Sequence, residues 1–296
     1  MEERKLIIDY RDSLTLFEKA MKKFQLKKII YRTLFRGKGL EFDGYRYFTD
    51  DDDYDSIDWK ASLRAGQKMV KQYKEERDVD VYFLVDCSES MLFGSGNKLK
   101  AEYVGEMVCV LTDLVLNSGD RAGLIMFSDN LVKFVKSSQK KENLFIFHKF
   151  LSDLSLYKGI FNLESCLKFA FNVAKGNTNS FILFSDLIHF KKEYINSLNI
   201  LFQKGDFFSV MVRDVFDEVL MKGLKISVKD PKSKEVVVID SNVARKIYQI
   251  NALRQKNILK KVFLEKGIDL LELKTNESFV LPLSNFMKKR AEELRI

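Results

Sequence analysis

Val81-Tyr82-Phe83-Leu84-Val85-Asp86-Cys87-Ser88-Glu89-Ser90 is the stretch that decides the fold. Its first five residues are apolar and rich in β-forming types, which predicts a strand buried on both faces of a sheet. Beyond the loop at 94–97, apolar residues recur at helical spacing, so residues 98–117 are predicted to form a largely buried helix. Gly119 is expected to end that helix. A buried strand followed by a long buried helix is typical of an α/β domain.

The same alternation continues to the end of the chain. Further strands are predicted at 122–127, 131–135, 181–184, 207–212 and 268–273, and helices at 141–154, 163–174, 191–203, 241–265 and 277–294. Asn162 and Ser241 are expected to cap two of these helices, and the strand at 131–135 should turn back beside its predecessor. The pattern predicts a mostly parallel, doubly wound α/β sheet with helices on both faces.

Two regions fall outside this alternation of strands and helices. Residues 1–78 are predicted to be an N-terminal extension packed on or beside an α/β domain at 79–296, and residues 215–240 a short β-rich insertion around a turn at 230–233. The single tryptophan, Trp59, lies in the extension. Since an indole ring is usually well buried, the segment around it is expected to dock against the α/β core.

Composition sets the broad class. The 296 residues are 46% hydrophobic and 31% charged with only 2 prolines, which indicates a globular protein. The sequence has no apolar run long enough for a membrane span or for the core of a signal peptide, so we expect a cytoplasmic protein. The cysteines, Cys87, Cys109 and Cys166, lie in apolar surroundings and are expected to be reduced core residues.

Charge is unevenly distributed near the N-terminus. Residues 1–38 hold eleven Lys or Arg against five Asp or Glu, a net charge of +6, whereas residues 41–58 hold eight acids against Arg46, a net charge of −7. The two segments could bind different partners or pair with each other. A basic surface that binds membranes or nucleic acid is one open hypothesis, although no nucleic-acid-reading module is evident.

Common enzyme motifs are missing from the sequence. No segment fits a phosphate-binding P-loop, and the only histidines, His148 and His189, lie outside any zinc-protease motif. In the phosphatase class that places an Asp after such a strand, the general acid two residues on would fall at Ser88. These absences favour a non-enzymatic protein.

Hard oxygen ligands do gather after the first strand. In extended chain, Asp86, Ser88 and Ser90 project to one side, and Asp186 follows another predicted strand at the same edge of the sheet. Such oxygens suit Mg²⁺ or Mn²⁺ and leave the ion open to an acidic group of a partner. The alternative is that these residues only cap the following loop and helix.

With these residues in view, a family resemblance can be given. Asp86-x-Ser88-x-Ser90, Gly119-Asp120-Arg121-Ala122-Gly123-Leu124 and Phe127-Ser128-Asp129 resemble the von Willebrand factor type A domain and its metal-ion-dependent adhesion site. Upstream, Gly37-Lys38-Gly39-Leu40-Glu41-Phe42, Tyr45-Arg46-Tyr47, Asp51-Asp52, Ile57-Asp58-Trp59-Lys60-Ala61 and Glu75-Glu76-Arg77 resemble the bacterial family called domain of unknown function fifty-eight. The resemblance implies a type A-like core and pairing with MoxR-type AAA+ ATPases in chaperone-like or maturation roles.

The chain departs from the family pattern at one ligand. Type A sites usually take a threonine from a Gly-x-Thr-Asn-Leu loop, and this chain has Phe161 at that position. The neighbouring Asn162 could supply a carbonyl oxygen instead. Binding of Mg²⁺ or Mn²⁺ is therefore expected to be weak or absent.

Two function classes stay open in addition to the basic surface that binds membranes or nucleic acid. The leading hypothesis is a non-enzymatic protein-binding adaptor that works with a MoxR-type ATPase. The other is a metal-dependent hydrolase that uses the Asp86 site, for which the sequence offers a metal site but no obvious base or nucleophile.

Overall fold

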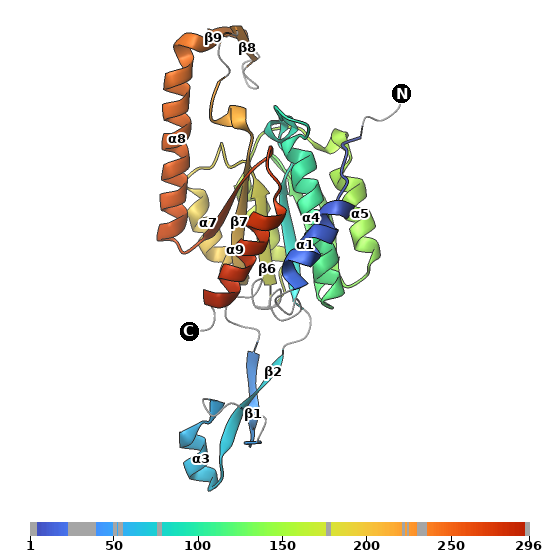
Figure 1. The fold of residues 1–296 in the computed structure, drawn as a ribbon, viewed down its shortest axis with the longest axis vertical. Helices are drawn as coiled ribbons and strands as arrows, with labels where there is room; N and C mark the ends of the chain where they lie inside the picture. Colours follow the sequence, from blue (N-terminus) through green and yellow to red (C-terminus); the bar gives the residue numbers. More distant parts are fainter. Residues whose placement is uncertain are drawn as a thin grey trace.

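The computed structural model describes residues 5–22, 40–49, 52, 56–75, 79–175, 179–220, 223, 225–229 and 236–293. Its centre is a six-stranded sheet (Figure 1). In spatial order the strands are β10 (Asp269–Lys274), β7 (Gly205–Arg213), β6 (Asn179–Ser185), β3 (Asp80–Asp86), β4 (Arg121–Phe127) and β5 (Leu131–Ser138). All neighbouring pairs are parallel except β4 and β5, so the prediction of a mostly parallel sheet with one returning strand is confirmed.

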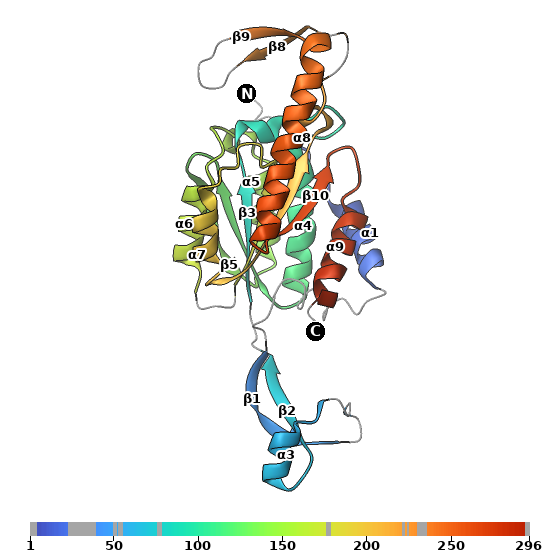
Figure 2. The ribbon, with the colours of Figure 1, turned by 90° about the vertical axis from the view of Figure 1, so that its left-hand side faces the viewer.

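Helices cover both faces of the sheet (Figures 1 and 2). One layer consists of α1 (Arg11–Lys22), α4 (Lys100–Asn117), α5 (Glu142–Leu151) and α9 (Val280–Glu293), and the other of α6 (Leu163–Val173), α7 (Tyr194–Leu201) and α8 (Ser241–Glu265). The central strands β3 and β6 are buried along their whole length, as their apolar sequences require. The three cysteines are buried and unpaired, as predicted.

Helix ends agree with the predicted caps in two of three cases. Asn162 caps α6 by accepting the Glu164 amide, and Gly119 follows α4 with a φ of 90° that suits glycine. The cap of α8 is Asp240 rather than Ser241, because Asp240 has the extended backbone of a cap residue and its carboxylate accepts the Asn242 amide at 2.9 Å.

The N-terminal residues divide into two parts. Residues 5–22 pack on the α4–α9 layer, where Phe17 and Met21 of α1 are fully buried. By contrast, β1 (Leu40–Tyr47), β2 (Met69–Glu75) and α3 (Trp59–Ala65) form a separate unit that lies beyond the layers of the core in both views (Figures 1 and 2). We call β1, β2 and α3 the distal unit.

The expected docking of Trp59 on the α/β core is wrong. Trp59 begins α3 in the distal unit, and 62% of its surface is exposed. The helix instead turns Ser62 inward, where its hydroxyl accepts the Met69 amide at 2.8 Å and donates to the Asp58 carbonyl. The need to satisfy these polar groups sets the face of α3 that packs on β2.

The β-rich insertion contains the hairpin β8 (Lys225–Lys229) and β9 (Val236–Asp240), which precedes α8. The turn predicted at 230–233 lies outside the described residues. The 25-residue α8 runs from this hairpin down one face of the sheet (Figure 2). None of the helices that the structure describes is long and apolar enough to cross a membrane.

Candidate functional site

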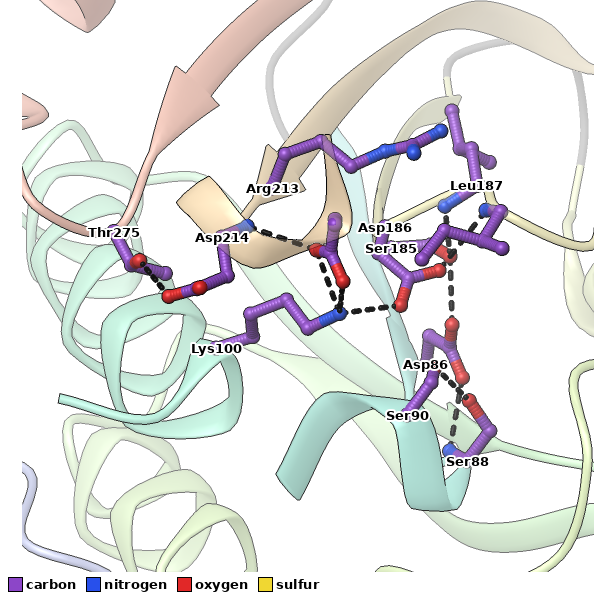
Figure 3. A network of polar contacts seen from close by, with 12 residues as sticks. Asp86, Ser88, Ser90, Lys100, Ser185, Asp186, Leu187, Arg213, Asp214 and Thr275 are labelled. Atoms are coloured by element: carbon purple, nitrogen blue, oxygen red, sulfur yellow. Dashed lines mark hydrogen bonds and ion pairs between the residues drawn. The ribbon is translucent and has the colours of Figure 1, made fainter. Parts of the chain in front are cut away.

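The predicted site lies where the parallel strands β3 and β6 end. Val85 pairs with Phe184 across these strands, so Asp86 and the pair Ser185-Asp186 reach the same edge of the sheet. Both aspartates are fully buried. Their convergence follows from two predictions that hold, namely strand position and parallel pairing, and Figure 3 shows the two carboxylates on neighbouring strand ends.

Both oxygens of the Asp86 carboxylate are bonded within the chain. One accepts the Ser88 amide at 2.9 Å, and the other accepts the Ser185 hydroxyl at 2.6 Å. The Ser88 and Ser90 hydroxyls lie 3.1 Å apart, and Ser90 contributes to lowering the pKa of Asp186. The three residues of the Asp-x-Ser-x-Ser motif thus come together as expected.

Asp86, Ser88 and Ser90 come together along a backbone path that differs from the predicted one. The prediction assumed extended chain through Ser90, but a short 3₁₀ helix, η2 (Glu89–Leu92), begins directly after Ser88. The turn bends Ser90 back toward Asp186, whereas extended chain would carry it away from the strand ends. The extended geometry is therefore wrong from Glu89 onward.

Lys100 is the residue of this site that sequence reasoning missed. It is the first residue of α4 and is fully buried. Its ammonium lies 2.8 Å from Oδ2 of Asp186 and 3.0 Å from Oδ2 of Asp217 (Figure 3 shows the first pair). A cation at a helix N-terminus opposes the helix dipole, so these carboxylates must supply the compensation.

The charges of this cluster shift one another's pKa values. Burial by itself would lower the pKa of Lys100, but the attraction of Asp186 and Asp217 outweighs burial and raises it. Burial likewise opposes ionisation of Asp186, and the Lys100 charge outweighs it, so the pKa of Asp186 is lowered. Lys100 and Asp186 therefore form a charged pair at neutral pH.

Asp86 has the opposite shift. Burial and, to a lesser extent, the Asp186 charge raise the pKa of its carboxyl, and the hydrogen bonds from Ser185 and Ser88 offset only part of that rise, so that the pKa is about 7. Asp86 is thus partly protonated at neutral pH. The two aspartates occupy different charge states because Lys100 contacts only one of them.

Two more aspartates follow β7 and extend the network. Asp217 ends the 3₁₀ turn η4 (Val215–Asp217), and Asp214 caps that turn. The Asp214 carboxylate accepts the Ser95 amide at 2.9 Å and the Thr275 hydroxyl at 2.8 Å. The rule that identified Asp186, an acid just after a predicted strand, would also have found Asp214.

The backbone beside Asp186 is held in an unusual conformation. Leu187 has a φ of 53°, rare for a residue with a side chain, and it is fully buried. Its amide donates to the Ser185 hydroxyl, and its carbonyl accepts the amide of Gln255 from α8 at 2.9 Å. Helix α8 therefore fixes the loop that carries Asp186.

The contacts of Phe161 and Asn162 are with residues other than Asp86 and Asp186. The Phe161 ring is buried against Phe127 and Tyr194, at centroid distances of 5.8 and 5.9 Å. Asn162 uses its carbonyl oxygen to cap α6 and donates its amide to the Asp129 carbonyl at 3.2 Å. The Phe161 ring has no oxygen, and the Asn162 carbonyl oxygen is engaged at the start of α6, so a role for Asn162 as a metal ligand stays a prediction.

The arrangement does not fit a resident Mg²⁺ or Mn²⁺. Each oxygen of Asp86 and of Asp186 accepts a hydrogen bond from the chain, and the donor to Oδ2 of Asp186 is the Lys100 ammonium, whose positive charge would repel a divalent ion. Mg²⁺ prefers about six oxygens, and the Ser88 and Ser90 hydroxyls are the other oxygens of this set. Within the described part of the chain, no group of three or more His, Cys, Asp or Glu side chains is placed to hold a metal ion. Metal binding by this set stays a prediction.

Comparisons with known proteins give the family. The family described as protein of unknown function DUF58 matches residues 44–258, well over half of the chain. No curated protein matches.

Several solved structures are similar at low identity. The conserved hypothetical protein BatB from Bacteroides thetaiotaomicron is 14% identical, with 72% of this chain and 99% of that chain covered and a TM-score of 0.48. An aerotolerance-related membrane protein from Bacteroides fragilis is 14% identical over 73% of this chain and 99% of that chain, with a TM-score of 0.46. A von Willebrand factor type A protein from Catenulispora acidiphila is 13% identical, with 75% and 44% covered and a TM-score of 0.37. The family match, which includes the strand and loop of the Asp86 site, is the finding that places the chain: it belongs to the DUF58 family of proteins of unknown function.

Proposed function

We propose that this protein is a non-enzymatic adaptor that binds another protein through the loops at the carboxyl edge of its sheet. We call this surface the loop face, and its exposed residues are Glu89, Phe93, Asp129, Lys158 and Ile160. Phe93 and Ile160 are large apolar side chains that are 42% and 46% exposed. Apolar residues with charged neighbours are typical of the surfaces that proteins use to bind one another.

The observation that carries this proposal is the bonding between the loops of the face. The backbone amide of Glu89 donates to the Gly159 carbonyl at 3.1 Å, and the backbone amide of Asn162 donates to the Ser128 carbonyl at 2.9 Å. Gly159 has a φ of 82°, and a side chain there would meet Asp129 at 2.7 Å. Because the loops are already fixed, a partner loses little by ordering them.

The bonding of the buried polar groups also favours binding over catalysis. The carboxylates of Asp86 and Asp186 are fully buried, and their oxygens are occupied by donors from the chain. A general base needs to reach the proton that it removes from a substrate. A turnover assay with phosphate-ester and nucleic-acid substrates, each with Mg²⁺ or Mn²⁺, would contradict the adaptor role if activity appeared and was lost in Asp86→Asn.

The partner that we propose is a MoxR-type AAA+ ATPase or its protein client, in a chaperone-like or maturation role. Membership of the DUF58 family supports this choice through the resemblance that the sequence carries. The charged residues Glu89, Asp129 and Lys158 would set the orientation of the complex, and their contribution should weaken as salt is added.

Binding of the purified ATPase to the immobilised full-length protein tests the proposal. Ile160→Asp places a charge in the apolar part of the loop face and should weaken binding at least about tenfold, the loss of a contact worth about 1.4 kcal/mol. Leu63→Asp is the matched control, since Leu63 is 85% exposed in the distal unit. It should bind like the wild type. Equal losses in both variants, or none in either, would place the interface elsewhere.

A further inference from the structure

The buried ammonium of Lys100 has a bonding pattern that suits a permanent cation. It donates to Oδ2 of Asp186 at 2.8 Å and to both oxygens of Asp217 at 3.0 and 3.2 Å. An ammonium has three hydrogens and no acceptor, so these three contacts satisfy it. Distances near 3 Å suit an ammonium, whereas Mg²⁺ requires oxygens at about 2.0–2.1 Å.

The same ammonium joins three separate segments of the chain. Lys100 begins α4, Asp186 follows β6 and Asp217 ends the turn after β7. The two aspartates lie 86 and 117 residues away from Lys100 in the sequence. A cation that binds acids from several loops holds those loops together, which is also what a bound metal ion would do at this edge of the sheet.

The Lys100 ammonium is also closed off from solvent. Its side chain is 1% exposed, and the Phe93 ring lies over it at 5.8 Å from the ring centroid. An aromatic face attracts a cation, so Phe93 adds to the hold of the carboxylates. A divalent ion that used Asp186 would have to displace this charge or sit beside it.

We propose that the ammonium of Lys100 is the resident cation of this site, so that the loop face is held in place without Mg²⁺ or Mn²⁺. The functional consequence rests on the proposed adaptor role: partner binding at this face should not depend on divalent ions. The inference about the cation itself concerns only folding and metal binding, and it can be tested without a partner.

The test compares thermal unfolding of the full-length protein in EDTA, Mg²⁺ and Mn²⁺, together with calorimetric titration of each metal. The wild type should unfold at the same temperature in all three solutions and give no saturable heat. Lys100→Met should unfold at a clearly lower temperature, because it leaves two buried carboxylates without a counter-charge. Lys168→Met is the matched control. Lys168 pairs with Glu164 at 3.1 Å on the outside of α6, where neither side chain is buried, so its loss should cost far less.

A second variant covers the case in which Lys100→Met does not fold. Lys100→Met combined with Asp217→Asn removes one of the uncompensated acids and should be more stable than Lys100→Met alone, which shows that the two side chains act as a pair. Saturable binding of Mn²⁺ to the wild type that is lost in Asp86→Asn would overturn the inference. Equal stability of Lys100→Met and Lys168→Met would overturn it as well. Partner binding enters neither result, so a failed adaptor role would be seen separately.

Discussion

Replacing Asp86 by Asn should make the protein more stable at neutral and alkaline pH. The carboxyl of Asp86 is fully buried, and burial together with the nearby Asp186 charge raises its pKa to about 7. The unfolded chain has a pKa near 3.9 for this group, so the folded state binds its proton more tightly by about three pH units. Asn keeps the side chain neutral at every pH and can donate to the Ser185 oxygen as a protonated acid would.

The sign and size follow from proton linkage. Because the pKa is raised on folding, the stabilising effect of this proton is fully present below about pH 4 and is lost as the pH rises through 7. Three pH units at about 1.4 kcal/mol each give a loss on the order of 4 kcal/mol. The wild type should therefore match Asp86→Asn near pH 4 and be less stable by up to that amount near pH 8.

Urea unfolding of both proteins at several pH values measures this difference. Asp129→Asn serves as the control for removing one carboxylate at the same edge of the sheet, since Asp129 is exposed. If the free-energy difference between the wild type and Asp86→Asn does not change between about pH 4 and 8, Asp86 does not hold a proton in the folded state and the reasoning fails.

Three further predictions concern packing and exposure. Phe161→Thr should destabilise the fold by about 3 kcal/mol, because it empties the space between Phe127 and Tyr194. With Lys100 in place, this substitution should not create Mg²⁺ binding, and calorimetry with and without Mg²⁺ checks both points. Trp59 should fluoresce like a solvent-exposed indole and be open to quenchers, and a blue-shifted, protected emission would contradict the exposed position. Arg290→Met should lower the free energy of unfolding by about 3–5 kcal/mol in a denaturant titration, because Arg290 is buried between Asp206 and Asp269 and over the Phe208 ring. A loss as small as that of an exposed ion pair would show that the two acids find other partners.

The sequence was sufficient for the sheet because its strands are buried on both faces. Continuous apolar runs such as those of β3 and β6 have few other stable arrangements, and their ends then place Asp86 and Asp186 at one edge. The cap at Asn162 is local, since a cap contacts an amide only two residues away, and local contacts can be read from sequence.

Contacts between distant residues explain the predictions that failed or were not made. Lys100 stands in the sequence Lys98-Leu99-Lys100 at a helix start, which looks like a solvated surface. Only the fold shows that acids from two other loops surround it. Trp59 was predicted to be buried and is exposed. The usual burial of an indole ring requires a hydrophobic core close by, and the distal unit provides little core.

The small size of the distal unit has a consequence for how the protein unfolds. Among the described side chains of residues 40–75 only Ile57, Ser62 and Val70 are buried, and segments below about 40 residues rarely fold on hydrophobic burial alone. Separated from the layers of the core in both views, this unit shares few of the contacts that would make it melt together with the sheet. Unfolding should then occur in two steps with different cooperativity, and a single midpoint would average two unequal equilibria. Hydrogen exchange at the backbone amides of β1 and β2 would report the distal unit, whereas circular dichroism would report mainly the α/β core.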